Sequence, residues 1–398
     1  MEDSQAVFDR TSRLNVVCWN ALILGYAENG DDTMALGWFE QFVQCCGGVA
    51  DSWTFVGVIR ACSSLASRES VESRTGTKIV SLEKGMAVHS RARSLGCQSS
   101  IYVASSLIDM YAKCGSMVDA RRVFDKAPSA TRDVVLWTTL VLGYAENGDG
   151  EAALEIFQLM KSEGCHLDVR VFAAALKACA VCSDLRSGEA VYEETCRHGI
   201  GQDPVVVSCL VDLYGKCGSV AGAQRTFDCS GPCGTATWNA LIAAYAQQGD
   251  SGKVFETFSK MLDEAAAREQ GESNGAGLYL KPDSLTLVSV LTACSHAGLA
   301  DKGKHILEAM PGKFGIQPSI EHYHCLVDLL GRANRVEEAL AMVEAMPFEA
   351  SAVTWTTVLG SCKSVEDIEV AKVAFDSLVS LNDRKSSAYV LMAEALNK

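Results

Sequence analysis

Three stretches of this chain are nearly copies of one another. They read WNALILGYAENGD from Trp19, WTTLVLGYAENGD from Trp137 and WNALIAAYAQQGD from Trp238. Each interval between them holds a copy of a second pattern, SSLIDMYAKCGSMVDARRVFD from Ser105 and SCLVDLYGKCGSVAGAQRTFD from Ser208. A chain that repeats itself at regular spacing folds as a stack of small units, each too small to bury its apolar face alone. We therefore expect an extended binding surface rather than one active-site pocket.

The apolar residues inside each copy follow a helical period. In the middle copy, Asn147-Gly148 forms a natural helix stop, because glycine readily adopts the left-handed conformation that ends a helix. The spacing predicts one helix on each side of this stop, with one face marked by Trp137, Leu140 and Tyr144 and the other by Ala153, Leu154, Phe157 and Met160. The sequence thus predicts an all-α solenoid of helix-turn-helix units.

The units come in groups of three. From Val134 to Thr235 the lengths are 35, 35 and 31 residues. The groups on either side are longer by two insertions, ASRESVESRTGTKIVS from Ala66 and AAAREQGESNGAGL from Ala265. Their glycine, serine and charged residues predict exposed, flexible loops.

The charge argues against a general nucleic-acid-binding protein. The formal net charge is -14, whereas non-specific affinity comes from lysine and arginine side chains that neutralise phosphates. This balance still permits a protein that reads bases one at a time. A local basic cluster, which we interpret mainly as a solvated loop, comprises Arg60, Arg68, Arg74, Lys78, Lys84, Arg91 and Arg93.

The cysteines and the apolar runs limit the class of protein further. The first residues, MEDSQAVFDR, resemble neither a secretory signal nor a transit peptide, and no apolar run is long enough for a transmembrane helix. Six of the 17 cysteines recur at matching repeat positions, which indicates reduced thiols at helix contacts rather than disulfides. These six are Cys62, Cys114, Cys179, Cys217, Cys294 and Cys362.

A protein-binding scaffold of the tetratricopeptide type is one candidate. The 34-residue pattern of that class is nearly satisfied by Trp19, Leu22, Tyr26, Ala35 and Phe39. The plain unit here is instead 35 residues long, the residue after the tryptophan is asparagine or threonine, and the last residue is aspartate.

With the 35/35/31 alternation, these features resemble the PLS subclass of pentatricopeptide-repeat proteins. The segments IEHYHCLVDLLGRANRVEEALAMVEAMPFEA from Ile320 and AVTWTTVLGSCKSVEDIEVAKVAF from Ala352 resemble the last S repeat and the E motif of that subclass. The resemblance implies a right-handed superhelix with P repeats at 16–51, 134–168 and 235–283, L repeats at 52–100, 169–203 and 284–319, S repeats at 101–133, 204–234 and 320–351, a partial S repeat at 1–15, an E-like motif at 352–385 and a shortened second one at 386–398.

The family binds single-stranded RNA with one repeat per base, the fifth and last residues of a P or S repeat reading that base. When this rule is applied to the present sequence, the pair Asn20 and Asp51 implies that the first P repeat binds U. The pair Asn239 and Asp283 implies U for the third P repeat. Ser105 with Asp133 and Thr138 with Asp168 each imply G. Ser208 also falls at a fifth position, but its repeat ends in Gly234 and gives no base. The implied string is U-x-G-G-x-x-U-x-x, from 5′ to 3′.

The second residue of each repeat packs against the base in this family. These positions hold Val17, Tyr102, Val135 and Val205, whereas Ala236 is smaller. A structural alternative remains open for the reading pairs, because an aspartate at the end of a unit is also a natural N-cap for the next helix. Base reading and capping are compatible with each other.

The resemblance further implies an adaptor that specifies a C-to-U editing site in a mitochondrial or chloroplast transcript. A deaminase would be recruited in trans through the E-like segment. Deaminase chemistry needs a His-x-Glu and a Cys-x-x-Cys that hold zinc; no histidine here has glutamate two positions on, and the single Cys-x-x-Cys, Cys179–Cys182, lies within a repeat. We therefore expect no catalytic residue, metal site, cofactor or membrane partner in this chain. RNA stabilisation or splicing, and a tetratricopeptide-like scaffold, are the alternatives.

Overall fold

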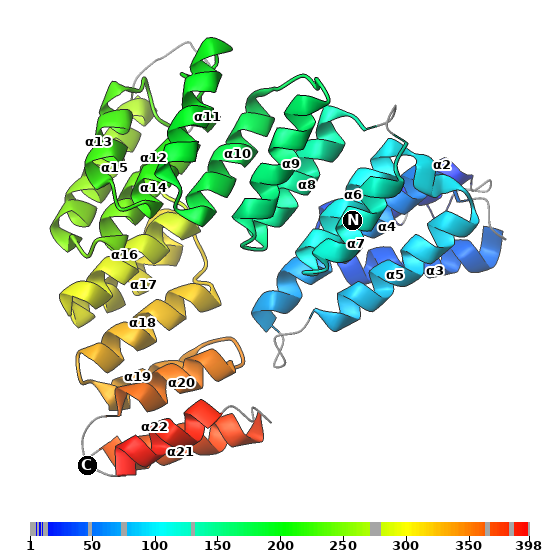
Figure 1. Ribbon diagram of the computed structural model, residues 1–398. Helices are drawn as coiled ribbons and strands as arrows, with labels where there is room; N and C mark the ends of the chain where they lie inside the picture. Colours follow the sequence, from blue (N-terminus) through cyan, green and yellow to red (C-terminus); the bar gives the residue numbers. More distant parts are fainter. Residues whose placement is uncertain are drawn as a thin grey trace. The chain divides into compact units, whose positions relative to one another are not determined.

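In the part of the chain that the computed structural model describes, the secondary-structure elements are all helices (Figure 1). The described residues are 5, 8, 10, 15–46, 50–72, 78–128, 132–270, 280–362, 367–381 and 386–396. Within them, no helix is long and apolar enough to cross a membrane. The predicted all-α solenoid class is confirmed, because the helices follow one another as stacked antiparallel pairs.

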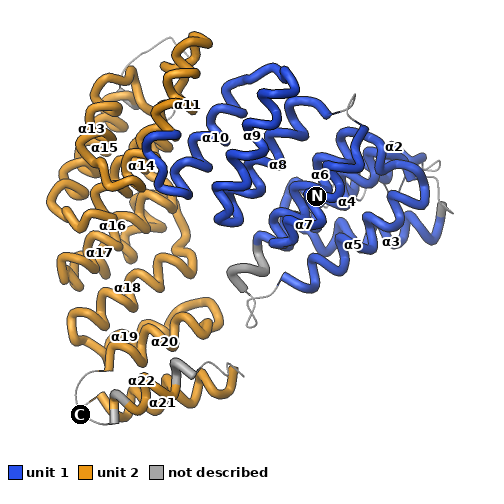
Figure 2. Tube along the Cα trace, viewed as in Figure 1, with its two compact units in different colours: residues 1–187 blue, residues 188–398 orange. Residues whose placement is uncertain are grey.

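The chain forms two compact units, residues 1–187 and 188–398, and the boundary falls within α11 (Leu185–Arg197) (Figure 2). The first unit contains α2 (Val16–Glu28), α3 (Asp32–Cys46), α4 (Ser52–Glu72), α5 (Ile79–Ser94), η1 (Cys97–Ser99), α6 (Ile101–Lys113), α7 (Met117–Lys126), α8 (Val134–Glu146), α9 (Gly150–Ser162) and α10 (Val169–Cys182). The second unit contains α12 (Pro204–Lys216), α13 (Val220–Cys229), α14 (Thr235–Gln247), α15 (Ser251–Gln270), α16 (Ser284–Ala297), α17 (Ala300–Ala309), η3 (Met310–Phe314), α18 (Ile320–Arg332), α19 (Val336–Ala345), α20 (Ala352–Ser361), α21 (Ile368–Ser380) and α22 (Ser386–Leu396).

The first helix of each pair packs on the first helix of the next pair. In unit 1 this row is α2, α4, α6, α8 and α10, and in unit 2 it is α12, α14, α16, α18 and α20. Each of these helices begins at the first residue of a repeat as divided above. The assignment of individual repeats to the P, L, S and E types remains a proposal.

The middle tryptophan copy shows why the sequence folds into pairs. Gly148 has a φ of 82° between α8 and α9, a conformation that glycine adopts without a steric penalty. Asp149 then caps α9 by accepting a hydrogen bond from the Ala152 N–H at 3.1 Å. Most of the predicted helical faces are buried, and only Tyr144 and Leu154 remain half-exposed.

A phenylalanine from the end of one repeat packs edge-on against the tryptophan of the next. The ring centroids lie 4.6 Å apart for Phe124 and Trp137 and 4.7 Å apart for Phe227 and Trp238. Phe8 and Trp19 make the same contact at 4.8 Å. The repeated contact holds consecutive pairs in register, because edge-to-face packing is the favoured geometry for aromatic rings.

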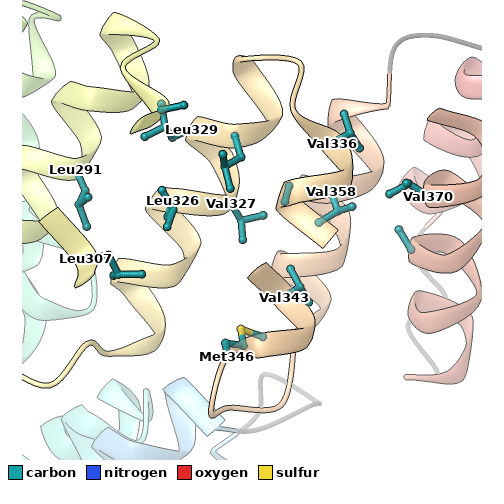
Figure 3. Close-up of a cluster of buried hydrophobic side chains, with 14 of the residues drawn as sticks. Leu291, Leu307, Leu326, Val327, Leu329, Val336, Val343, Met346, Val358 and Val370 are labelled. Carbon is teal, nitrogen blue, oxygen red and sulfur yellow. The ribbon is translucent and has the colours of Figure 1, made fainter. Parts of the chain in front are cut away.

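The core of the C-terminal pairs is aliphatic. Leucine, valine and methionine side chains from α16 to α21 interdigitate there, including Leu291, Leu326, Leu329, Val358 and Val370 (Figure 3). Each pair buries its apolar stripe against the following pair, as the repeat pattern requires.

Two expectations about loops are wrong in part. Helix α4 continues through the start of the first insertion to Glu72, and α15 continues through the start of the second to Gln270. Residues 66–72 and 265–270 are therefore helical, because alanine, glutamate and arginine continue a helix readily. The glycine-rich remainders, 73–77 and 271–279, lie outside the described residues.

The basic cluster is also not mainly a loop. Arg60 lies on α4, and Lys84, Arg91 and Arg93 lie on α5. Arg74 lies outside the described residues. Lys84 and Arg91 line one cavity of unit 1, and Arg93 lines another.

Four of the six recurring thiols are buried as predicted, whereas Cys114 and Cys217 are half-exposed C-caps of α6 and α12. The cysteines whose side chains the structure describes form no disulfide with one another. Burial raises the pKa of Cys62 to about 12 and that of Cys294 to about 11, so these thiols stay protonated.

Candidate nucleic-acid interface

The structure brings together the side chains of Asn20 and Asp51, which are 31 residues apart in sequence. The Asn20 Nδ2 donates a hydrogen bond to the Asp51 Oδ1 at 2.9 Å. Thr54 completes the cluster: its hydroxyl lies 2.6 Å from the Asn20 Oδ1, and its N–H donates to the Asp51 Oδ1 at 2.9 Å. The fifth residue of one repeat, its last residue and the third residue of the next repeat therefore form one polar cluster.

The same cluster recurs in unit 2. The Asn239 Nδ2 donates to the two carboxylate oxygens of Asp283 at 2.9 and 3.0 Å, and the Thr286 hydroxyl donates to the Asn239 Oδ1 at 2.5 Å. Asn239 is only 4% exposed. The hydrogen bonds to Asp283 and from Thr286 fix the orientation of its amide. Two independent copies of the same geometry show that the sequence specifies it.

Chemistry fixes the orientation of both amides. A threonine hydroxyl can donate its proton to the amide oxygen but a carboxylate cannot, so the amide nitrogen must face the aspartate. Burial alone would raise the pKa of Asp51, but hydrogen bonds from the Thr54 N–H and the Asn20 side chain lower it on balance. The carboxylate is therefore ionised at neutral pH and presents acceptor oxygens beside an amide donor.

The pairs assigned to G are arranged differently. The Ser105 Oγ donates to the Tyr102 carbonyl at 3.1 Å, and the Thr138 Oγ1 donates to the Val134 carbonyl at 2.6 Å. Neither hydroxyl bonds the aspartate of its own repeat within the described structure, and each is satisfied by its own helix.

Those two aspartates cap the next helix. Asp133 accepts from the Leu136 N–H at 2.9 Å, and Asp168 accepts from the Val171 N–H at 3.0 Å. The Asp168 Oδ2 also pairs with the Arg170 guanidinium at 3.2 Å, so both of its oxygens are engaged. The capping interpretation is thus correct for Asp51, Asp133, Asp168 and Asp283.

Capping leaves room for a second role. A carboxylate has about four lone-pair sites, and an N-cap uses one of them. Ser208 stands at the fifth position of a repeat that ends in Gly234, and Gly234 is the N-cap of α14 without a side-chain hydrogen bond. His324, at the fifth position of the last S repeat, lies 2.6 Å from the Thr354 hydroxyl through its Nε2.

Within each unit, most second residues of the repeats are apolar and exposed, and they form a row along the first helices. Val17 is 69% exposed, Tyr102 59%, Val135 41% and Val205 50%. Such exposure is costly in water unless a ligand covers it. Sequence reasoning missed three further members of the row, Trp53, Leu285 and Val353, which lie at the second positions of their own repeats and are equally exposed.

Trp53 and Tyr102 stack on each other. Their ring centroids lie 5.3 Å apart and the rings are inclined by 24°. Nucleobases stack on such aromatic faces with little dependence on base identity.

A groove of about 600 Å³ in unit 1 runs beside this row. Its lining joins Tyr102, Ser105 and Val135 to the charged side chains of Arg60 and Lys113. The cations have partners: Arg60 lies 3.4 Å from Glu28, and Lys113 lies 2.8 Å from Asp109. The groove therefore combines apolar faces, a small hydroxyl and screened positive charge.

Sequence reasoning also missed Thr54 and Thr286. The signal is present as Asp-Ser-Trp-Thr from Asp51 and Asp-Ser-Leu-Thr from Asp283, a variant of the capping box. It accompanies both asparagine pairs, whereas Leu136 and Val171 occupy the equivalent place after Asp133 and Asp168.

The described side chains contain no group of three or more His, Cys, Asp or Glu residues that could hold a metal ion. The His322 ring, which resembles a ligand in sequence, instead packs between repeats, with its Nε2 3.0 Å from the Ser284 carbonyl.

The segments that match known protein families lie in the same repeats. Residues 17–46, 102–129, 236–264 and 321–348 match the PPR repeat, and residues 132–181 match the PPR repeat family. In Arabidopsis thaliana, the pentatricopeptide repeat-containing protein CRR2, chloroplastic, is 35% identical over 98% of this chain and 56% of its own length. A second relative from the same organism, named putative pentatricopeptide repeat-containing protein At3g13770, mitochondrial, is 31% identical over 99% of this chain and 58% of its own length.

Solved structures share the fold. Pentatricopeptide repeat protein PPR10 from maize aligns with a TM-score of 0.57 and 19% identity, covering 99% of this chain and 57% of its own. The complex of PPR10 with an 18-nt psaJ RNA element aligns with a TM-score of 0.52 and 18% identity, covering 96% of this chain and 61% of its own. The chain spans about half the length of the curated relatives that it matches. Its repeats, its helical stack and these relatives identify it as a pentatricopeptide-repeat protein.

Proposed function

We propose that this chain is a sequence-specific adaptor that binds single-stranded RNA with one repeat per base. The observation that carries the proposal is the cluster of Asn20, Asp51 and Thr54, repeated at Asn239, Asp283 and Thr286. In both clusters an amide donor stands beside a carboxylate acceptor, near exposed apolar side chains. Relatives support the proposal, since PPR10 is known in complex with RNA.

Uracil suits these clusters chemically. Its Watson–Crick edge presents an N–H donor flanked by carbonyl acceptors, and unpaired bases expose this edge. One amide hydrogen of Asn20 remains for a carbonyl oxygen, and the Asp51 carboxylate can accept the N–H. Val17 would cover the face of that base, while Tyr102, Val135 and Val205 would cover others.

The proposed register assigns U to repeats 16–51 and 235–283 and G to repeats 101–133 and 134–168. The test is binding of the purified chain to RNA carrying U-x-G-G-x-x-U and to the same RNA with the four bases exchanged, at near-physiological salt. The matched RNA should bind at least about tenfold more tightly, the scale of one or two base contacts. Equal binding of both would contradict base reading and leave capping as the function of these residues.

A substitution separates RNA reading from a peptide-binding scaffold. Asn239→Ser should lower the preference for U at its position and leave the preference at the position of Asn20 unchanged. Val118→Ser, at an exposed side chain of α7, is the control and should alter neither. A scaffold that binds peptide would show no base preference to lose.

The finer proposal is that the chain specifies a C-to-U editing site in a mitochondrion or chloroplast and recruits a deaminase in trans. Related proteins are named chloroplastic or mitochondrial. Residues 352–385 and 386–398 would supply the docking surface; in the described part, α20, α21 and α22 pack together and expose Val373, Val379 and Tyr389.

Organelle transcripts from plants that lack the gene test this finer proposal. Loss of editing at one cytidine just 3′ of a matching sequence is the expected result. Intact editing with altered transcript ends would indicate RNA stabilisation instead, and retained introns would indicate splicing.

A further inference from the structure

A cavity in unit 1 lies apart from the groove of the candidate interface. It has a volume of about 320 Å³ and is lined by residues of α5, η1, α6 and α7 together with Leu136 of α8. Its apolar lining includes Ala104 and Leu107. This volume is at the lower end of the range for small-molecule sites.

The charges around the cavity are unbalanced. Arg93, Arg122 and Lys126 line it, and Asp119 is the one acidic residue of the lining. Asp119 pairs with Arg122 at 3.0 Å and accepts from the Ser116 hydroxyl at 2.7 Å, so it compensates one cation. No hydrogen bond or ion pair engages Arg93 or Lys126 among the described residues.

The pKa of His89, which also lines the cavity, is affected by the same positive charges. Burial, and after it the charges of Lys126 and Arg93, lower the pKa of His89. Its Nδ1 lies 2.8 Å from the Tyr111 hydroxyl, and burial raises the pKa of Tyr111 to about 12. The cavity thus offers neutral polar groups beside an excess of two positive charges, in a chain with a net charge of -14.

Comparison with unit 2 shows which features of the cavity are common to the repeats and which belong to unit 1 alone. The equivalent place in unit 2 is a cavity of about 340 Å³, lined by Leu210, Tyr214 and Arg225 where unit 1 has Leu107, Tyr111 and Arg122. The repeat packing therefore explains the shape. It does not explain the cations, because Cys196 and Cys229 stand where unit 1 has Arg93 and Lys126.

We propose that the unit 1 cavity binds an organic phosphate monoester such as a mononucleotide, with the phosphate held between Arg93, Arg122 and Lys126. A dianion would balance the two uncompensated charges through charge-assisted hydrogen bonds. The apolar lining accepts the organic part, which a free phosphate ion lacks. A free mononucleotide and the 5′-phosphorylated end of an RNA present the same chemical group.

Titration calorimetry with AMP tests the proposal. AMP should bind the full chain, and the double variant Arg93→Cys, Lys126→Cys, which copies unit 2, should bind it at least about tenfold more weakly, the scale for loss of charge-assisted bonds. Arg121→Gln is the matched control, because Arg121 pairs with Asp125 and does not line the cavity. Its affinity for AMP should be unchanged.

Two further binding experiments identify which part of the ligand the cavity recognises. Adenosine and inorganic phosphate should each bind at least about tenfold more weakly than AMP. A short RNA that binds more tightly with a 5′-phosphate than with a 5′-hydroxyl, with the gain lost in the double variant, would assign the phosphate to an RNA end. Absence of AMP binding, equal binding of inorganic phosphate, or undiminished binding by the double variant would overturn the proposal.

Discussion

At the residue scale, the reading positions are held by threonines that belong to the next repeat. Thr54 and Thr286 each satisfy an amide oxygen that faces away from its aspartate. An asparagine without this partner could rotate its amide by half a turn and exchange donor for acceptor. We infer that these threonines are positioning residues for the proposed uracil contacts.

Thr286→Val tests this inference. The Asn239 oxygen would lose its hydroxyl donor in a buried place, which should cost about 1–3 kcal/mol of stability and lower the preference for U at this position. Urea unfolding and RNA competition measure the two effects. Thr357→Val is the control, because the Thr357 hydroxyl bonds only the Val353 carbonyl of its own helix among the described residues. Preserved stability and preference in Thr286→Val would exclude a positioning role.

The thiols give a second prediction at this scale. Buried thiols with raised pKa values react slowly with alkylating reagents, since the thiolate is the nucleophile. At pH 8, exposed Cys45, Cys196 and Cys229 should be alkylated long before buried Cys62 and Cys294. Mass spectrometry of peptides after short labelling measures the order. Early labelling of Cys62 would show that α4 opens readily.

At the scale of the elements, small residues set the distance between neighbouring first helices. A Cβ on Gly215 of α12 would lie 2.7 Å from the Ala244 Cβ and 3.3 Å from its Cα on α14. The obstruction is close to the backbone, so it cannot be relieved by a change of rotamer. The close packing of α12 on α14 therefore requires glycine here.

Gly215→Ala should destabilise unit 2 by about 1–3 kcal/mol, the range for overpacking a tight contact. Gly37→Ala is the matched control in α3, where an added Cβ meets nothing within 4 Å. The control should be neutral or stabilising by about 0.5–1 kcal/mol, because alanine favours a helix. Urea unfolding followed by circular dichroism measures both, and equal effects would refute the packing argument.

At the scale of the whole molecule, the net charge is negative, yet the groove beside Tyr102 and Val135 is lined by the cations Arg60 and Lys113. Lys113 lines the groove but pairs with Asp109 on its own helix. An RNA phosphate would compete with this exposed pair, which contributes little to stability in water. Such competition would make RNA binding depend on salt despite the net charge of -14.

Lys113→Gln should weaken binding of every RNA sequence similarly and reduce the slope of log affinity against log salt by about 0.7, the value for one phosphate contact on a single strand. Lys260→Gln, which removes a cation paired with Glu256 on α15, should leave the slope unchanged. Titrations at several salt concentrations measure the slopes. An unchanged slope for Lys113→Gln would show that this lysine meets no phosphate.

The sequence by itself determined the repeat, the helix pairs and the positions where helices begin. Tryptophan, leucine and glycine at fixed spacing suffice for that, because each signal acts within one repeat or on the next. The pairs Asn20–Asp51 and Asn239–Asp283 could also be named, since the family pattern fixes their offsets.

Only the tertiary structure decided what each side chain touches. It placed Thr54 and Thr286 on the asparagines, set Arg170 against Asp168 and stacked Trp53 on Tyr102. It also extended α4 and α15 into the insertions and gathered Arg93 and Lys126 around one cavity. These outcomes depend on distances between residues of different helices, and such distances follow from packing rather than from local spacing.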